Sequence, residues 1–275
     1  MQQLKPFDLT GRVAVVTGGN GGIGFGIARA LGLAGATIVI WARDLDKTRA
    51  ALSALEAEGI EAMSFRCDVS VEADVRDAAV AAVERAGRID ICVANAGGVA
   101  QQDFLESDLA TWESTISKNL TGTYLCFREC AREMVTRDDG GALIAVSSVS
   151  AVHGSPRMHD YAAAKAGLGG LVRSVAVELA PFRIRANVLQ PGFTENSRRS
   201  VKLVERSAAL ESLAAIPAGR WGTPDDLGVA ALYLADPTLS YHTGAELRVD
   251  GGFAVMPPHI AARESRRLSL EGSDG

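Results

Sequence analysis

Residues 13–24 read VAVVTGGNGGIG, and this stretch decides the fold class of the chain. Its first five residues are an apolar, β-branched run that predicts a buried strand, and the alanine-rich segment 23–34 predicts an amphipathic helix. Between them, Gly18 permits a tight turn, Gly22 lets the backbone approach a pyrophosphate, and Gly24 allows close packing of helix against strand. Free N–H groups at the helix N-terminus favour phosphate oxygens. The stretch therefore predicts a binding site for a dinucleotide.

The alternation of strand and helix continues along the chain. Further short apolar runs predict strands at residues 37–41, 62–67, 89–94, 143–147, 185–189 and 245–249. Amphipathic segments predict helices near residues 45–58, 72–86, 111–134, 161–181 and 224–235. The inner strands are continuous apolar runs, which are typical of a parallel sheet covered on both faces. We expect a single-domain α/β fold, a Rossmann-type doubly wound parallel sheet of about seven strands flanked by helices.

Two segments interrupt this alternation. Residues 193–223 form a long insertion at the predicted carboxyl edge of the sheet, a place where lids over active sites are common. Residues 253–275 form a C-terminal extension whose polar end we expect to be disordered. We therefore place one domain at residues 1–252, with the insertion inside it.

The composition is that of an ordinary soluble enzyme. Of the 275 residues, 47% are hydrophobic and 22% are charged, and the net charge is -5. A negative balance without a basic cluster argues against nucleic acid as a partner. No apolar run approaches the ~20 residues of a membrane span, and the start lacks the apolar core of a signal peptide. We expect a cytoplasmic protein that binds neither nucleic acid nor membrane.

The cysteines form neither a zinc-type nor a disulfide-rich pattern. They are Cys67, Cys92, Cys126 and Cys130, and none belongs to a C-x-x-C pair. Cys126 and Cys130 share one face of a predicted helix, so a metal site is conceivable there, but small buried residues are the favoured interpretation. We predict no metal.

Tyr161-Ala162-Ala163-Ala164-Lys165 is the stretch that points to chemistry. Its spacing places the phenol and the ammonium on one face of a helix. Ser148 lies thirteen residues before the tyrosine, just past a predicted strand. Tyr161 would give its proton to a carbonyl oxygen, to which Ser148 would donate a hydrogen bond, and the Lys165 ammonium would favour the phenolate. Such a set interconverts an alcohol and a carbonyl. The neighbouring serine, Ser147, is expected to face the other side of the strand end.

The end of the second strand bears on the identity of the dinucleotide. An NAD-specific site usually has an acidic residue there, which binds the ribose 2′-hydroxyl. This chain has Ala42 at that position and Arg43 after it, and a guanidinium suits a 2′-phosphate, so NADP(H) is favoured. NAD(H) stays an open alternative, because Asp44 could take the acidic role and Gly21 leaves the glycine turn without a basic residue to support Arg43.

Two more segments suit a dinucleotide groove. Asp68-Val69 follows the third predicted strand, where a carboxylate can accept a hydrogen bond from an adenine amino group. Asn95-Ala96-Gly97 follows the fourth, where small residues would admit the cofactor backbone. Each would be an ordinary loop without the other motifs.

Taken in order, these motifs resemble the classical short-chain dehydrogenase/reductase family over residues 8–252. The motifs are Thr17-Gly18-x-x-x-Gly22-x-Gly24, Asn95-Ala96-Gly97, Asn119, Ser148, Tyr161-x-x-x-Lys165 and Pro191-Gly192. The resemblance implies an NAD(P)-dependent oxidoreductase that acts on a small carbonyl or alcohol and forms a homotetramer or homodimer. It implies that Asn119 positions a water in a proton path, that Lys165 holds the ribose hydroxyls, and that Asp250-Gly251-Gly252 takes part in tetramer contacts.

Residues and resemblance together assign the cofactor contacts. They are Gly18, Asn20, Gly22, Ile23, Gly24, Arg43, Asp68, Val69, Asn95, Ala96, Gly97, Tyr161, Lys165, Pro191, Gly192 and Thr194. The chain departs from the family at two places. Ala94 stands where a second asparagine is common, and Asn196 stands where a threonine is usual after Thr194, the residue expected at the nicotinamide carboxamide.

The substrate pocket is expected between residues 98–104, residues 149–160 and the insertion. Its candidate lining residues are Gly98, Val149, His153, His159 and Phe193. Surface or packing roles compete with substrate contact for both histidines. A sugar or polyol, a 3-oxoacyl thioester and another small carbonyl all stay open as substrates. Two other functions on the same fold compete with the oxidoreductase: a catalytically silent protein that senses NADP, and an isomerase or dehydratase.

Overall fold

Parallel strands form one sheet, and helices connect them. The computed structural model describes residues 6–195 and 213–257. The strands are β1 (Val13–Thr17), β2 (Thr37–Ala42), β3 (Ala62–Arg66), β4 (Ile91–Ala94), β5 (Gly141–Val146), β6 (Ile184–Pro191) and β7 (Glu246–Val249). The α-helices of these two described ranges are α1 (Gly22–Leu33), α2 (Leu45–Ala57), α3 (Glu72–Ala86), α4 (Leu109–Ile116), α5 (Gly122–Arg137), α6 (His159–Leu179) and α8 (Pro224–Ala235).

The sheet has the strand order β3-β2-β1-β4-β5-β6-β7, and every neighbouring pair is parallel. The direction in which strands are added reverses between β1 and β4. In open α/β sheets of this kind, ligands bind at the carboxyl ends of the strands beside such a reversal. The doubly wound parallel sheet expected from the sequence is confirmed, and its topology places the binding crevice beside the glycine turn.

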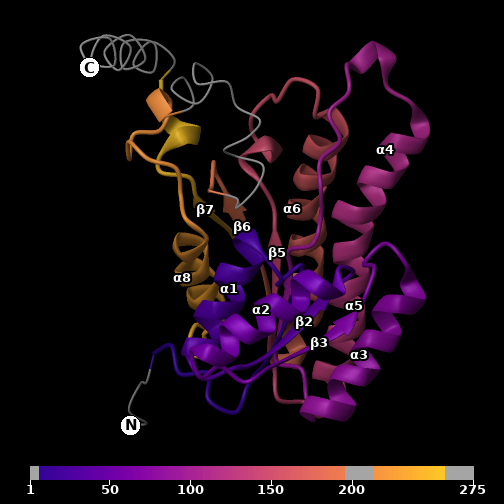
Figure 1. Ribbon diagram of the computed structural model, residues 1–275, viewed down its shortest axis with the longest axis vertical. Coiled ribbons are helices and arrows are strands. Elements are labelled where there is room, and N and C mark those ends of the chain that lie inside the picture. Colours follow the sequence, from indigo (N-terminus) through magenta and orange to yellow (C-terminus); the bar gives the residue numbers. More distant parts are fainter. Residues whose placement is uncertain (1–5, 196–212, 258–275) are drawn as a thin grey trace.

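Helices cover both faces of the sheet (Figure 1). α3, α5 and α6 pack on one face, and α1, α2 and α8 pack on the other. Successive side chains of a strand point to opposite faces. In β1, Val13 and Val15 enter the first core, while Ala14 and Val16 enter the second. The continuous apolar runs of the inner strands arise because both faces are buried.

The predicted helix 111–134 is interrupted, which corrects the sequence analysis. α4 ends at Ile116, and a π-helical turn, Ser117–Thr121, leads into α5. A π-helical turn holds one extra residue per turn and is frequent at functional sites. The apolar periodicity of residues 111–134 does not indicate this π-helical turn, because the same helix faces stay buried before and after it.

The two irregular segments are only partly described. The ends of the insertion approach one another, since Thr194 forms an isolated bridge with Gly222, and residues 196–212 lie outside the described residues. Gly251 and Gly252 have φ angles of 63° and 90°, and they turn the chain into a 3₁₀ helix, Phe253–Val255. Residues 258–275, for which we expect disorder at the end, also lie outside the described residues.

None of the helices in the described residues is long and apolar enough to span a membrane. The cysteines are free and buried, as expected for small core residues.

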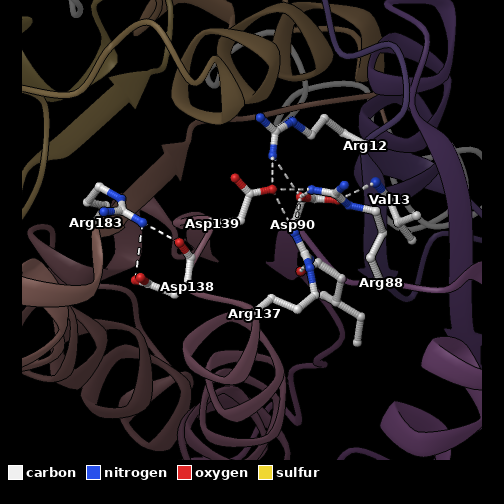
Figure 2. A network of polar contacts seen from close by, with 9 residues as sticks. Arg12, Val13, Arg88, Asp90, Arg137, Asp138, Asp139 and Arg183 are labelled. Carbon is white, nitrogen blue, oxygen red and sulfur yellow. Dashed lines mark hydrogen bonds and ion pairs between the residues drawn. The ribbon is translucent and has the colours of Figure 1, made fainter.

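An ion-pair network closes the amino edge of the sheet, opposite the predicted crevice (Figure 2). Its centre is Asp90, whose side chain is 3% exposed and accepts hydrogen bonds from Val13 N at 2.9 Å and Arg12 Nη1 at 2.9 Å. Arg88 Nε donates to the same carboxylate at 2.7 Å, and Arg137 Nη2 at 3.3 Å. β4 begins at Ile91, two residues later than predicted, because Asp90 belongs to this network.

Candidate active site

The glycine turn joins β1 to α1 in the conformation that the sequence predicts. Gly18 and Gly22 have φ angles of 65° and 52°, a region that favours glycine. A Cβ on Gly24 would lie 2.4 Å from the Gly18 carbonyl oxygen, so only glycine allows this approach of helix to turn. No side chain of the described residues caps the N-terminus of α1, and its first turn holds no acidic residue. The free N–H groups of that turn are therefore directed at the crevice, as an anion site requires.

Asn95 fastens the end of β4 to the glycine turn. Its Nδ2 donates to the Thr17 carbonyl oxygen at 2.9 Å. The Thr17 hydroxyl oxygen accepts from Asn95 N at 2.9 Å and from Ala96 N at 2.8 Å. The loop is held so close that a Cβ on Gly18 would lie 3.1 Å from Asn95 Nδ2. A single asparagine thus holds the two strand ends together, and the alanine before it lies in the buried strand β4.

The far end of the crevice carries the residues predicted to bind the adenosine half of a dinucleotide. Arg43 Nη1 forms an ion pair with Asp68 Oδ2 at 3.2 Å. Asp68 also accepts from the Ser70 hydroxyl at 2.6 Å, and the hydrogen bonds from Ser70 and Arg43 outweigh burial and lower its pKa. Asp44 caps α2, because its Oδ1 accepts from Lys47 N at 3.0 Å. One oxygen of the Asp44 carboxylate therefore serves the helix cap, and NAD(H) stays an alternative cofactor.

One continuous cleft of about 980 Å³ connects these parts. It runs from Arg43 and Asp68 past the glycine turn to Tyr161 and Phe193. All the predicted cofactor residues line it except Gly22 and Pro191, which belong to the backbone behind it. Glycine positions without side chains, free helical N–H groups and cations at one end fit an extended, anionic dinucleotide.

Lys165 and Tyr161 lie at the inner end of the cleft, on the first turns of α6. The Lys165 side chain is buried, and its Nζ donates to the Val146 carbonyl oxygen at 2.8 Å. Nζ lies 5.5 Å from the centroid of the Tyr161 ring. It also lies 3.6 Å from the position that a Cβ on Gly97 would take, so the missing side chain of Gly97 leaves space in front of the ammonium.

The two serines after β5 have different contacts. The Ser148 side chain lies near enough to the Tyr161 phenol to lower its pKa, and its hydroxyl accepts from Ser150 N at 3.2 Å. The Ser147 hydroxyl is buried and donates to the Lys165 carbonyl oxygen at 2.9 Å. Ser148 is thus the serine beside the phenol, and Ser147 ties the strand end to α6.

The pKa of Tyr161 in the chain without cofactor does not follow the expectation that Lys165 lowers it. Burial raises the pKa of the Tyr161 phenol, and the hydrogen bond from Ser148 only partly offsets this. Burial also lowers the pKa of Lys165 to about 8. The predicted lowering of the Tyr161 pKa by Lys165 is therefore not found in the chain alone, because the ammonium points to the Val146 carbonyl oxygen and is itself destabilised by burial.

Asn119 sits in the π-helical turn and is fully buried. Its Nδ2 donates to the Gly98 carbonyl oxygen at 2.8 Å and to the Thr115 carbonyl oxygen at 2.9 Å, and its Oδ1 accepts from Gly98 N at 3.2 Å. A Cβ on Gly97 would lie 2.4 Å from that Oδ1. Asn119 therefore fixes the loop after β4 against the lysine side of the cleft, a role that its sequence neighbours do not reveal.

Comparisons with known proteins agree with this geometry. A family model described as enoyl-(acyl carrier protein) reductase matches residues 18–254. The chain is 38% identical over 244 residues to 3-oxoacyl-(acyl-carrier-protein) reductase FabG of Chlamydia pneumoniae, which covers 89% of this chain and 97% of that protein. The crystal structure of a short-chain type dehydrogenase/reductase from Mycobacterium marinum has a TM-score of 0.83 at 35% identity, covering 90% of this chain and 97% of that one. The chain belongs to the short-chain dehydrogenase/reductase family.

Another similar solved structure contains a bound dinucleotide. It is a gluconate 5-dehydrogenase from Burkholderia cenocepacia in complex with NADP and tartrate, with a TM-score of 0.85 and 33% identity, covering 90% of this chain and 97% of that one. As a short-chain dehydrogenase/reductase, the present chain is an NAD(P)-dependent oxidoreductase of alcohol and carbonyl groups, which confirms the class predicted from its motifs.

The substrate side of this short-chain dehydrogenase/reductase differs in part from the predicted pocket. Gly98 and Phe193 line the cleft, whereas Val149 is buried beside Ser148. His159 lies between two aromatic rings of the α4 region, 5.1 Å from Phe104 and 6.2 Å from Trp112 between ring centroids. His159 therefore has a packing contact, the alternative that the sequence left open.

Phe253 is a residue of this side that sequence reasoning missed. Its ring centroid lies 5.1 Å from that of His153 and 5.1 Å from that of Phe193. The three rings join the loop after Ser148, the loop after Gly192 and the C-terminal 3₁₀ helix into one aromatic cluster. The signal that could have found Phe253 is the Gly251-Gly252 pair before it, because two glycines with positive φ turn the chain back toward the cleft.

Proposed function

We propose that this protein is an NADP(H)-preferring oxidoreductase that interconverts a small carbonyl compound and its secondary alcohol, with Tyr161 as general acid and base. The observation that carries the proposal is the position of the Tyr161 phenol, which lies beside Ser148 and one helical turn from the buried Lys165 at the inner end of the cleft. When bound, the dinucleotide would supply or accept the hydride.

The residues of the chain handle the proton and the substrate oxygen. Tyr161 donates its proton to the oxygen during reduction, and its raised pKa keeps it protonated at neutral pH. Ser148 donates a hydrogen bond to the same oxygen and stabilises the negative charge that develops there. Lys165, with a pKa of about 8, is mainly an ammonium at neutral pH and holds the ribose hydroxyls. Asn119 positions the loop beside Lys165 and a water on the proton path.

Two substrate classes are supported by the relatives. One has the activity of a 3-oxoacyl-(acyl-carrier-protein) reductase and another that of a gluconate 5-dehydrogenase. We propose a 3-oxoacyl thioester or a sugar-derived hydroxy compound as the substrate. Phe193 and Phe253 provide an apolar surface beside the reacting centre that either a carbon chain or a sugar ring can contact.

We further propose that the protein is a cytoplasmic homo-oligomer with one domain at residues 1–252. Exposed apolar side chains on neighbouring helices support self-association, since Leu109 and Trp112 of α4 and Tyr124 of α5 are 69%, 36% and 43% exposed. Free, buried cysteines support a reducing compartment.

A parallel assay with two cofactors tests the proposed function. Oxidation of NADPH and of NADH is followed by nicotinamide absorbance with 3-oxoacyl thioesters, sugar-derived ketones and simple ketones. We expect turnover with at least one of these classes and a higher kcat/KM with NADPH. Replacing Arg43 with Ala should lower kcat/KM for NADPH by about 10-fold and leave that for NADH unchanged, because one charge-assisted contact to the 2′-phosphate is lost.

Two other results would contradict the oxidoreductase proposal. Tight cofactor binding without turnover of any ketone or alcohol would identify a catalytically silent sensor instead. Product formation without net oxidation or reduction of the cofactor would identify an isomerase or dehydratase.

A further inference from the structure

Lys47 reaches from the first turn of α2 to the glycine turn. A Cβ on Gly21 would lie 2.5 Å from Lys47 Nζ and 2.6 Å from its Cε. Nothing else lies within 4 Å of that position. The end of the lysine side chain therefore occupies the space that Gly21 leaves open. Both residues line the cleft, together with Arg43.

Space for Lys47 explains why a glycine stands at position 21. The backbone of Gly21 has a φ of 170° and a ψ of 167°, an extended conformation that any residue adopts. Gly21 thus differs from Gly18 and Gly22, whose positive φ values favour glycine. The glycine turn has no basic side chain of its own, and Lys47 brings a cation to it from another element.

Among the described residues, no side chain neutralises the charge of Lys47. In the ranges 6–195 and 213–257 its ammonium has no hydrogen-bond or ion-pair partner, and the side chain is exposed. The nearby carboxylates have other partners: Asp44 accepts from Lys47 N, Asp46 pairs with Arg49, and Asp68 pairs with Arg43. A cation in the first turn of a helix is also disfavoured by the helix dipole. An anion bound in the cleft would pair with the ammonium and would offset its unfavourable interaction with the helix dipole.

We propose that Lys47 binds the 2′-phosphate of NADP(H) together with Arg43 and is the principal determinant of the preference for NADP(H) over NAD(H). This inference rests on the proposed function. The two cations flank the start of α2, and Asn20 holds this start against the glycine turn. Its Nδ2 donates to the Thr48 hydroxyl at 2.9 Å and to the Asp44 carbonyl oxygen at 3.4 Å. The cleft therefore presents two cations on a backbone that Asn20 holds in place. Arg43 is shared with Asp68, and Lys47 has no partner among the described residues.

Binding measurements on single variants test this role. Dissociation constants for NADPH and NADH are measured by the fluorescence of the bound reduced nicotinamide for the wild type, Lys47→Ala and Lys47→Gln. We expect both substitutions to weaken NADPH binding by about 10- to 100-fold, as for the loss of a hydrogen bond between charged groups, and to leave NADH binding unchanged. Arg49→Ala is the matched control, because it removes an exposed cation of the same helix that is paired with Asp46. It should change neither constant.

Gly21→Ala provides a second test that leaves the lysine in place. The added methyl group should displace the Lys47 ammonium and weaken NADPH binding without weakening NADH binding. In the Lys47→Ala background the same substitution should have no further effect, because the two changes act on one interaction. Thermal unfolding midpoints equal to that of the wild type would show that the variants are folded.

The binding measurements distinguish a failure of the Lys47 inference from a failure of the proposed function. NADPH binding that survives Lys47→Ala, or an equal loss of NADPH and NADH binding, overturns the role of Lys47 and leaves the oxidoreductase proposal intact. A wild type that prefers NADH overturns this inference and the cofactor preference, but not the alcohol–carbonyl chemistry. A wild type that binds neither dinucleotide overturns the proposed function and this inference together.

Discussion

Replacing Tyr161 with Phe is expected to lower kcat by about 10²- to 10⁴-fold, the usual contribution of a positioned general acid. The ring remains and only the hydroxyl is lost, so the Kd for NADPH should stay close to that of the wild type. The substrate oxygen would keep the hydrogen bond from Ser148 but would have no proton donor. Steady-state assays together with cofactor titrations measure both quantities.

The pH dependence follows from the direction of the pKa shift at Tyr161. Burial raises the pKa of this phenol, so its proton is retained at neutral pH. We expect loss of the Tyr161 proton to lower kcat for reduction only as the pH rises through that raised value. Tyr241→Phe is the control for loss of a phenol, because this residue is fully exposed at the other edge of the molecule. Full reductase activity in the Tyr161→Phe variant would remove Tyr161 from the mechanism.

Replacing Asp90 with Asn is expected to give the largest loss of stability, about 3 kcal/mol in the free energy of unfolding. The carboxylate is 3% exposed and is shared by three arginines, whose own side chains are 22–30% exposed (Figure 2). Its removal leaves Asp139 as the only carboxylate that these guanidinium groups contact among the described residues, and weakens the bond to Val13 N at the start of β1. Urea unfolding followed by circular dichroism measures the difference.

Asp138→Asn is the matched control for this network. Asp138 pairs with Arg183 at the surface, where the two side chains are 73% and 64% exposed, so little stability should be lost. Burial alone would raise the pKa of Asp90, but hydrogen bonds from Arg88, Val13 N and Arg12 lower it. Its contribution is therefore present above the unfolded-state pKa and is lost as the pH falls through the folded-state pKa. Curves of stability against pH for the wild type and Asp90→Asn that run parallel through the acid range would contradict this assignment.

Much of the fold could be predicted from the sequence because one physical pattern repeats. Strands buried on both faces must be apolar throughout, and the glycine turn admits only one local geometry. β1 was therefore predicted at its observed bounds, Val13–Thr17. The predicted start of β4 was wrong because Ile89 suggests a longer apolar strand, whereas the Asp90 side chain after it belongs to the ion-pair network. The π-helical turn at Asn119 was missed because it leaves the buried faces of α4 and α5 in place.

The sequence predicts the geometry of the candidate site where its residues lie on one helix or strand. Tyr161 and Lys165 share a helix, so four residues of separation define their geometry. Contacts between distant elements were not predictable in the same way. Lys47 follows Gly21 by 26 residues, and Phe253 follows Ser148 by more than a hundred. Only the folded chain brings Lys47 to the glycine turn and Phe253 against His153 and Phe193.

Transfer of label from the cofactor to the product is the most direct test of the central claim, that this cleft passes hydride to a carbonyl carbon while Tyr161 passes the proton. The wild type and Tyr161→Phe are incubated with NADPH deuterated at the transferable position and with the carbonyl compound that the assay identifies, and the alcohol is analysed by mass spectrometry. The account predicts one deuterium on the carbinol carbon with the wild type and almost no product with Tyr161→Phe. Alcohol formed without deuterium, or formed equally fast by the variant, would contradict it.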